Sequence, residues 1–472
     1  MKKKTKIVAT ISDKICTVEF LQTLFDAGMN VVRLNTAHQT PDEAIKVINI
    51  AREVSPEIAI LVDTKGPEIR TVRDGDDLVV AKGDKLKIAG DTNAKTTNEC
   101  LYVSYNDFVK DVPVGSSVLI DDGDVELKVI KKDDSFLYAE VENSGVIKRR
   151  KSVNVPNVSI NLPSVTERDK EFIKMAIEND ADFIAHSFVR NRDDVMAVQS
   201  IIDEYGSDIK IIAKIENQEG VDNLDDILKC AYGIMIARGD LAIEIPAHKV
   251  PVVQRMIVQK CVQSKRPVIV ATQMLHSMIE NPRPTRAEIS DIAEAVYMGT
   301  DAIMLSGETA YGKYPVEAVA VMTRTAREIE DDMETNPPKS RIVNIDNEIT
   351  ATLAESAVKA SLHLPVKAVI IDTLSGRTGR YISAFRGKYP VYAICYKKSI
   401  MRQMALSYGV KAEYMPNHSS RTMFLRTAMD KFLDKNEFSP DDLIIVVGGS
   451  FGASNGASFM EIAQIKNLQN AD

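Results

Sequence analysis

The chain has 472 residues, of which 44% are hydrophobic and 27% are charged, and its formal net charge is -8 at pH 7. A chain of this length is usually too long to fold around one hydrophobic core, so we expect two or three domains. The composition excludes a disordered chain. The acidic balance argues against a nucleic-acid partner, and the sequence has no apolar stretch long enough for a signal peptide or a membrane span. Five dispersed cysteines without a CxxC pair favour a cytoplasmic location and provide no zinc motif.

Short apolar runs alternate with amphipathic segments through the first 330 positions, a pattern typical of repeated strand–helix units. Eight strands are predicted, at residues 6–12, 30–35, 58–64, 182–188, 209–216, 233–240, 267–273 and 301–306. Eight parallel strands with intervening helices predict a (β/α)8 TIM barrel, which we assign to residues 1–69 and 157–333.

The alternation is interrupted between residues 70 and 156, where alternating apolar positions and Asp-Gly and Lys-Gly turns predict a small all-β domain. This domain is inserted after the third strand, at the end of a barrel where active sites lie, so it could act as a lid that excludes water. A passive insertion is the alternative, and the sequence leaves both open. The segment NPPKSRIVNIDNE resembles a linker, and the strands and helices after it predict a C-terminal α/β domain at 345–472.

Polar side chains follow the apolar part of seven of the eight predicted strands. The stretch IIAKIEN is the clearest example, because Lys214 and Glu216 are two residues apart and therefore project from one face of a strand. An ion pair that caps a core strand would explain this stretch alone. However, polar residues recur at the ends of strands around the barrel, and this recurrence indicates a functional site. The full set is Arg33, Asn35, Asp63, Lys65, Ser187, Lys214, Glu216, Arg238, Asp240, Thr272, Ser306 and Glu308.

The residue types of this set point to phosphoryl transfer. Glu216 and Asp240, on successive strands, supply two hard oxygen ligands of the kind that Mg²⁺ or Mn²⁺ prefers. Positive charge for an anionic, phosphorylated substrate comes from Arg33, Lys65, Arg70, Lys214 and Arg238. His186 lies beside Ser187 but faces the opposite side of its strand, so no Ser-His-Asp arrangement competes. A metal with convergent cations suits a reaction in which catalysis is mainly positioning and charge neutralisation.

The chain resembles the pyruvate kinase family along essentially its whole length. The resemblance rests on MNVVRLN, DTKGPEIR, AKIEN, ARGDLAIEIP, ATQML, NPRPTRAEISD and MLSGETAYGKYP, in this order. It implies the same barrel, an inserted β lid, a C-terminal α/β domain and a homotetramer. The implied reaction transfers phosphate from phosphoenolpyruvate to ADP and gives pyruvate and ATP.

The resemblance also implies roles for individual residues. Glu216 and Asp240 would hold the divalent ion, Lys214 would neutralise the phosphoryl group in transfer, and Arg33 would bind phosphate. Thr272 lies where the enolate is protonated. The remaining implied contacts are Ala237, Arg238, Gly239, Asp240, Ser187 and Ser306 for the substrate, and His38 and Arg70 for the nucleotide.

A potassium ion is implied at Asn35, Asp63 and the carbonyl group of Thr64. The family's usual serine ligand is replaced by Ala37, so one hydroxyl ligand is lost and the site should be weaker. Glu68 favours dependence on potassium, because family members that dispense with potassium commonly have lysine at that position. We therefore predict activation by K⁺.

The stretch DTLSGRTGR at 372–380 could form a phosphate cradle from Thr373, Ser375, Gly376, Arg377 and Thr378. An ordinary strand–helix turn with an N-cap serine is the alternative. The resemblance implies a regulatory sugar phosphate here. The family's second effector loop corresponds to GGSFGASNG at 448–456, which lacks arginine and tryptophan, so the identity of a phosphorylated effector stays open.

Two other functions are compatible with parts of the sequence. A metal-dependent aldolase-type lyase would bind a related enolate, but it would need no ADP and no lid domain. A regulatory protein would sense sugar phosphate through the C-terminal domain. The presence of Lys214, Glu216, Asp240 and Thr272 argues against a pure sensor, which has no physical need for them.

Overall fold

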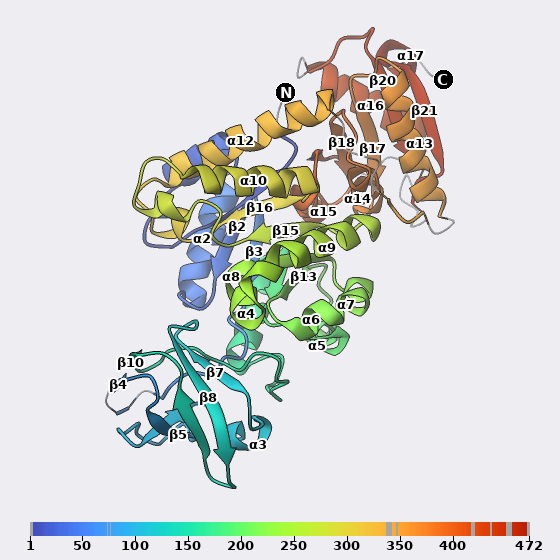
Figure 1. Ribbon diagram of the computed structural model, residues 1–472. Helices are drawn as coiled ribbons and strands as arrows, with labels where there is room; N and C mark the ends of the chain where they lie inside the picture. Colours follow the sequence, from blue (N-terminus) through green and yellow to red (C-terminus); the bar gives the residue numbers. More distant parts are fainter. Residues whose placement is uncertain are drawn as a thin grey trace.

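The computed structural model describes residues 3–72, 74–75, 77–336, 342–345, 348–416, 421–434, 437–449 and 456–469. A barrel occupies the middle of the molecule, a small β domain lies at one end and an α/β domain at the other (Figure 1). The predicted architecture of a barrel with two further domains is therefore confirmed. No helix among the described residues is long and apolar enough to cross a membrane.

Eight parallel strands form the closed barrel in the order β1-β16-β15-β14-β13-β12-β3-β2. Strand β1 pairs with both β2 and β16, and this pairing closes the ring. All eight predicted strands are present, each ending before the last predicted residue or at it. The strands are β1 (Lys6–Thr10), β2 (Val31–Asn35), β3 (Ala59–Asp63), β12 (Phe183–His186), β13 (Lys210–Ile215), β14 (Gly233–Ala237), β15 (Val268–Ala271) and β16 (Ala302–Leu305).

Helices surround the barrel, and several begin where a threonine side chain caps the first turn. Thr40, Thr166 and Thr285 each form a capping box with the acidic residue three positions on, which satisfies backbone N–H groups that a helix start leaves free. The helices are α1 (Val18–Ala27), α2 (Pro41–Val54), α4 (Glu167–Glu178), α5 (Arg192–Glu204), α6 (Gln218–Asp222), α7 (Leu224–Cys230), α8 (Arg238–Glu244), η1 (Ala247–Lys249), α9 (Val250–Gln263), η2 (His276–Ile279), α10 (Arg286–Met298), α11 (Gly307–Ala310) and α12 (Pro315–Thr335).

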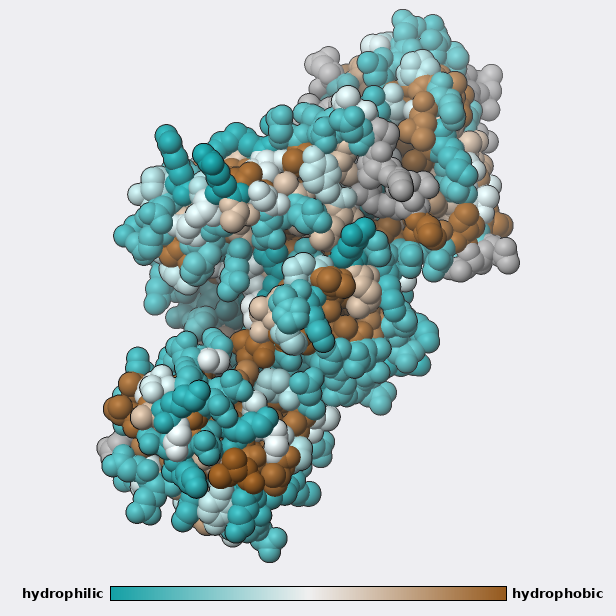
Figure 2. Space-filling view, in the orientation of Figure 1, coloured by the Kyte–Doolittle hydropathy of each residue, from teal (hydrophilic) through white to brown (hydrophobic). Residues whose placement is uncertain are grey.

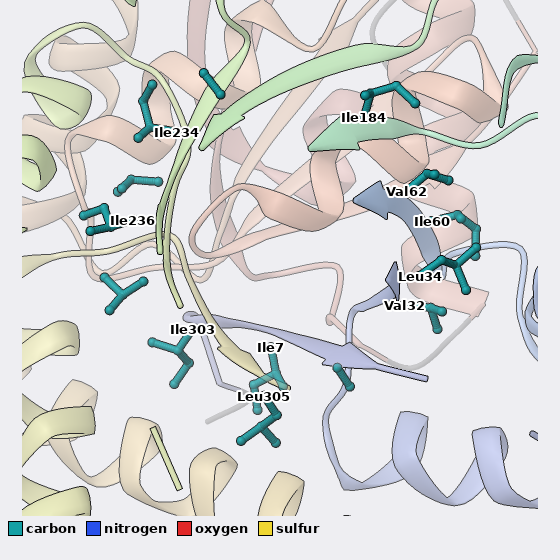
Figure 3. Packing of buried hydrophobic residues seen from close by; sticks show 14 of the residues in the cluster. Ile7, Val32, Leu34, Ile60, Val62, Ile184, Ile234, Ile236, Ile303 and Leu305 are labelled. Atoms are coloured by element: carbon teal, nitrogen blue, oxygen red, sulfur yellow. The ribbon is translucent and has the colours of Figure 1, made fainter. Parts of the chain in front are cut away.

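Alternate strand residues fill two separate hydrophobic layers. Side chains such as Ile7, Ile60 and Ile184 pack between the strands and the surrounding helices (Figure 3). Their neighbours, such as Leu61 and Phe183, fill the inside of the barrel. Because the period of a strand is two, the residues that continue the inner layer past the strand ends point into the barrel mouth.

The inserted domain contains a six-stranded sheet, in the order β11-β7-β8-β9-β5-β6, and a two-stranded sheet of β10 and β4. Its buried hydrophobic residues form their own cluster between Ile69 and Val155, separate from the barrel core. One short helix interrupts the predicted all-β pattern. The elements are β4 (Leu78–Val80), β5 (Lys85–Gly90), β6 (Cys100–Val103), α3 (Phe108–Asp111), β7 (Ser117–Ile120), β8 (Val125–Lys132), β9 (Leu137–Val141), β10 (Gly145–Ile147) and β11 (Val153–Asn154).

The C-terminal domain is a five-stranded sheet in the order β19-β18-β17-β20-β21, with helices packed against it. Its last strand is antiparallel to β20 and is not among the predicted strands. Residues 450–455 of the predicted effector loop lie outside the described residues. The elements are α13 (Ile349–His363), β17 (Val369–Thr373), α14 (Arg377–Ala384), β18 (Val391–Cys395), α15 (Lys398–Gln403), η3 (Met404–Leu406), β19 (Val410–Tyr414), α16 (Arg421–Asp434), β20 (Leu443–Gly448), β21 (Phe459–Gln464) and α17 (Ile465–Gln469).

Buried ion pairs join the C-terminal domain to the barrel. The guanidinium of Arg386 lies 2.8 Å from the carboxylate of Asp301, and that of Arg402 lies 2.6 Å from Asp182. Asp182 also accepts a hydrogen bond from the backbone of Ile60, so this contact reaches strand β3. On the visible face, hydrophilic side chains predominate and hydrophobic patches are scattered among them (Figure 2).

Candidate active site

Lys214, on strand β13, lies at the centre of a group of charged side chains at the carboxyl ends of the barrel strands. Its Nζ lies 3.0 Å from Oδ1 of Asp63 and 2.9 Å from Oε1 of Glu216, and it donates a 2.7 Å hydrogen bond to the hydroxyl of Ser187. Burial lowers the pKa of Lys214, but the carboxylates of Asp63 and Glu216 outweigh burial and raise that pKa above its ordinary value. The ammonium is held charged, and Lys214 and Glu216 project into one space, as their spacing predicts.

Arg33 enters the same group from strand β2, with two of its three guanidinium nitrogens held. Its Nε donates to Oδ2 of Asp63 at 2.6 Å, and its Nη1 donates to the hydroxyl of Thr10 at 2.9 Å. Burial raises the pKa of Asp63, but the charges of Arg33 and Lys214 bring it below its ordinary value. Within the part of the chain that the structure describes, Nη2 of Arg33 has no acceptor, so this nitrogen can donate to an anion.

The two carboxylates predicted to bind a divalent ion come from successive barrel segments, Glu216 after β13 and Asp240 in α8 after β14. Glu216 is buried, and its Oε2 accepts a 2.6 Å hydrogen bond from the backbone of Phe188. Burial raises the pKa of Glu216 to about 7, with Asp240 adding to the effect and Lys214 opposing it. Burial also raises the pKa of Asp240. Two neighbouring carboxylates supply hard oxygen atoms of the kind that a divalent cation such as Mg²⁺ prefers.

Among the described residues, no group of three or more His, Cys, Asp or Glu side chains is arranged to hold a metal. A divalent ion held by Glu216 and Asp240 would need oxygen atoms of substrate or water as its further ligands. Such a site suits Mg²⁺, which usually keeps waters and takes few protein ligands.

The residues predicted to hold potassium lie at the ends of β2 and β3. Asn35 and Asp63 are register partners, and the Thr64 carbonyl oxygen accepts a 2.7 Å hydrogen bond from the hydroxyl of Ser187. Ala37 is exposed, and its N–H donates to Oδ1 of Asn35 at 3.2 Å. Each of these oxygen atoms has a protein partner, and Ala37 supplies no side-chain oxygen, so the potassium site stays a prediction.

Thr272 begins the turn after strand β15 and lies beside the segment that follows β14. Its hydroxyl oxygen accepts a 2.8 Å hydrogen bond from the N–H of Gly239. The guanidinium of Arg238 faces the protein, donating to the carbonyl oxygen of Thr272 at 2.6 Å and pairing with Asp291 at 2.6 Å. The structure therefore brings Thr272 to the turn that contains Asp240. The guanidinium of Arg238, which the sequence assigned to a substrate, is paired with protein groups.

A cleft of about 740 Å³ lies between the inserted domain and the barrel. Its lining includes Arg70 and Asp122 on one side and Phe188, Asn217 and Asp240 on the other. One of the proposed metal carboxylates and one of the predicted nucleotide residues therefore face the same space. A ligand held by the barrel mouth could contact the inserted domain across this cleft.

Two other predicted residues lie on loops near the barrel mouth. His38 is on an exposed turn after β2 and is not part of the lining of the cleft. Ser306 follows β16, and its N–H donates to Oε2 of Glu308 at 2.7 Å, while Oε1 of Glu308 accepts from the N–H of Leu275 at 3.1 Å. Glu308 is thus a buried carboxylate that joins the loops after β15 and β16.

Thr10 and Asp291 are site residues that sequence reasoning missed. Thr10 ends β1, the one predicted strand for which no candidate residue was named, so the same positional rule could have found it. Asp291 lies within helix α10, and nothing in its local sequence marks it as a partner of Arg238.

The predicted effector segment forms the turn between β17 and α14. Gly376 has a φ of 75°, which suits glycine, and its N–H donates to the hydroxyl of Thr373 at 2.9 Å. The N-cap of α14 is Gly376, so the alternative of an N-cap serine is wrong. Arg377 pairs with Glu348 at 2.8 Å.

Comparisons with known proteins agree on one family. The model of the pyruvate kinase barrel domain matches residues 2–319, and that of the pyruvate kinase α/β domain matches residues 351–463. A pyruvate kinase of Borreliella burgdorferi is 46% identical over 470 residues, covering 98% of each chain. One from Bacillus licheniformis is 44% identical over 98% of this chain and 80% of its own length. The crystal structure of a pyruvate kinase from Cryptosporidium parvum superposes with a TM-score of 0.90 at 36% identity, covering 98% of this chain and 96% of that one.

Proposed function

The chain belongs to the pyruvate kinase family, and on that premise we propose that it transfers the phosphoryl group of phosphoenolpyruvate to ADP, giving pyruvate and ATP. The observation that carries this proposal is the buried group of Arg33, Asp63, Lys214 and Glu216 at the barrel mouth. It combines cations for a phosphoryl group with a carboxylate for a metal, which is what phosphoryl transfer requires of a protein.

Lys214 neutralises charge on the phosphoryl group during transfer, and Arg33 binds a phosphate oxygen through its open Nη2. Asp63 contacts both cations, at 3.0 Å and 2.6 Å, so they are already in place when the substrate arrives. Charges that need no rearrangement during the reaction stabilise a transition state most effectively. Ser187, whose hydroxyl contacts Lys214, helps to hold the ammonium there.

Glu216 and Asp240 hold Mg²⁺ or Mn²⁺, and their positions after the successive strands β13 and β14 support this assignment. When bound, the ion neutralises oxygen atoms of the substrate as a Lewis acid. Asn35, Asp63 and the carbonyl of Thr64 hold K⁺.

The turn of Ala237, Gly239 and Asp240 seats the substrate carboxylate, and Ser306 contributes to the substrate pocket. Thr272 is the residue beside which the enolate of pyruvate takes up its proton, delivered through water. Arg70 and His38 contact the nucleotide, and the position of Arg70 in the cleft supports its part of this assignment.

The further properties of the family stay predictions for this chain. They are a homotetramer, a cytoplasmic location, closure of the inserted domain as a lid, and a phosphorylated effector at Thr373, Ser375, Gly376, Arg377 and Thr378.

The test is pyruvate formation from phosphoenolpyruvate, ADP and Mg²⁺, with and without K⁺. Lys214→Met should abolish turnover, whereas Lys210→Met, a matched change at the other end of strand β13, should retain it. Folded native protein that forms no pyruvate under any of these conditions would contradict the proposal and favour the lyase or the sensor.

A further inference from the structure

The turn after strand β15 has an unusual backbone conformation. Thr272 and Gln273 have φ angles of 69° and 55°, in the left-handed region that side chains other than glycine avoid. Among the described residues, ten non-glycine residues have positive φ, and Thr272 is the only one with a β-branched side chain. Each such residue costs about 1–3 kcal/mol and persists only where its surroundings hold it in place.

The guanidinium of Arg238 is the group that holds this turn. Its Nη2 donates to the carbonyl oxygen of Thr272 at 2.6 Å and contacts Sδ of Met274 at 2.9 Å, while its Nε donates to the carbonyl oxygen of Ala271 at 3.3 Å. On the other side, Nη1 donates to Asp291 at 2.6 Å. The side chain of Arg238 is 12% exposed, so its donors are directed to the protein.

The residue after Arg238 orients the Thr272 hydroxyl. The N–H of Gly239 donates to Oγ1 of Thr272 at 2.8 Å, which leaves the hydroxyl proton free to point elsewhere. No acceptor for that proton occurs in the described part of the protein. Arg238 and Gly239 thus fix both the carbonyl group and the hydroxyl group of one residue.

We propose that Arg238 is a positioning residue that acts through Thr272. It holds the strained turn so that the Thr272 hydroxyl faces the carbon that takes up the proton, and Asp291 in turn holds the guanidinium. This inference rests on the proposed function. It assigns the Arg238 charge to the protein and leaves the substrate phosphate to Arg33 and Lys214.

The full-length protein with Mg²⁺ and K⁺ is compared with Arg238→Met, Asp291→Asn, Thr272→Val and the double variant Arg238→Met/Thr272→Val. Two rates are measured: pyruvate formation, and exchange of the pyruvate methyl protons with D₂O by NMR. In the exchange a C–H bond of pyruvate breaks and the proton passes to solvent, which reverses the protonation step.

We expect Arg238→Met to lower the exchange rate and kcat by about 100-fold, the effect of a misplaced catalytic group, while KM for phosphoenolpyruvate changes little. Asp291→Asn should lower the same two rates by a smaller factor, and it carries the test if Arg238→Met does not fold. Arg238→Lys, which keeps the positive charge and one donor nitrogen, should recover part of the loss. The double variant should be no slower than the slower single variant, because both changes remove the same contribution, that of the positioned Thr272 hydroxyl.

Losses that multiply in the double variant, or a KM that rises with kcat unchanged, would overturn the inference, because both indicate a guanidinium that binds substrate directly. Native protein without turnover would instead overturn the proposed function, and this inference with it.

Discussion

The ion pair of Arg386 and Asp301, which joins the C-terminal domain to the barrel, allows a quantitative prediction. Two guanidinium nitrogens lie 2.8 Å and 3.0 Å from the two carboxylate oxygens, and the side chains are only 3% and 5% exposed. Changing Arg386 to Met would leave a buried, unpaired carboxylate, which costs about 3–5 kcal/mol. Asp301 would keep hydrogen bonds from the N–H groups of Val268 and Tyr408, so we expect the lower end, about 3 kcal/mol.

The matched control is Lys397→Met, which breaks a second contact between the same two domains. Lys397 lies 2.9 Å from Asp208, but both side chains are more than half exposed, so its loss should cost about 1 kcal/mol at most. Urea unfolding followed by far-UV circular dichroism measures both, since the chain has no tryptophan for fluorescence. Equal destabilisation by the two variants would refute the argument that burial makes the first pair important.

Three further predictions concern acid stability, the metal and Arg33. Burial lowers the pKa of His186 to about 4 from an ordinary 6.5, so its contribution is fully present above pH 6.5 and is lost as the pH falls towards 4. The native protein should therefore lose about 3 kcal/mol more stability than His186→Phe on acidification, measured by urea unfolding at pH 7 and pH 4.5. An equal loss of stability in the two proteins would contradict this prediction. Glu216→Gln should raise the Mg²⁺ concentration for half-maximal activity by about tenfold or more, because one of two charged ligands is lost; unchanged Mg²⁺ activation would place the ion elsewhere. Thr10→Val should lower kcat/KM for phosphoenolpyruvate by about tenfold, the value of one hydrogen bond to a charged group, and Thr10→Ser, which keeps the hydroxyl 2.9 Å from Arg33, should not.

The barrel strands could be predicted from the sequence because parallel strands buried on both faces are continuous apolar runs. Their ends were less predictable. The run at 233–240 was predicted as one strand, but β14 ends at Ala237 and helix α8 begins at Arg238. Strand β21 was missed because its residues, Phe459–Gln464, are all only partly buried and carry no strong apolar pattern. The residue limits given to the three domains stay a prediction.

The charged residues of the site could be predicted because polar side chains at strand ends are conspicuous in an apolar background. Their individual partners could not. Arg238 was assigned to a substrate on its charge and on the family resemblance, and neither predicted its partner Asp291, which lies 53 residues away on another helix. Such a pairing depends on how helix α10 packs against the barrel, which no local pattern records.

The closure of the barrel between its first and last strands sets an order of events during synthesis. Strand β1 pairs with β16 in the register Lys6 to Ala302, so the ring cannot close until about 300 further residues have been made. At a ribosomal rate of about 5–20 residues per second, strand β1 waits for roughly 15–60 s before its partner β16 has been made. The inserted domain has its own core, and its chain is complete long before that. A nascent chain that has just passed the inserted domain therefore carries a finished domain and only three of the eight barrel strands, whose outer edges are still unpaired.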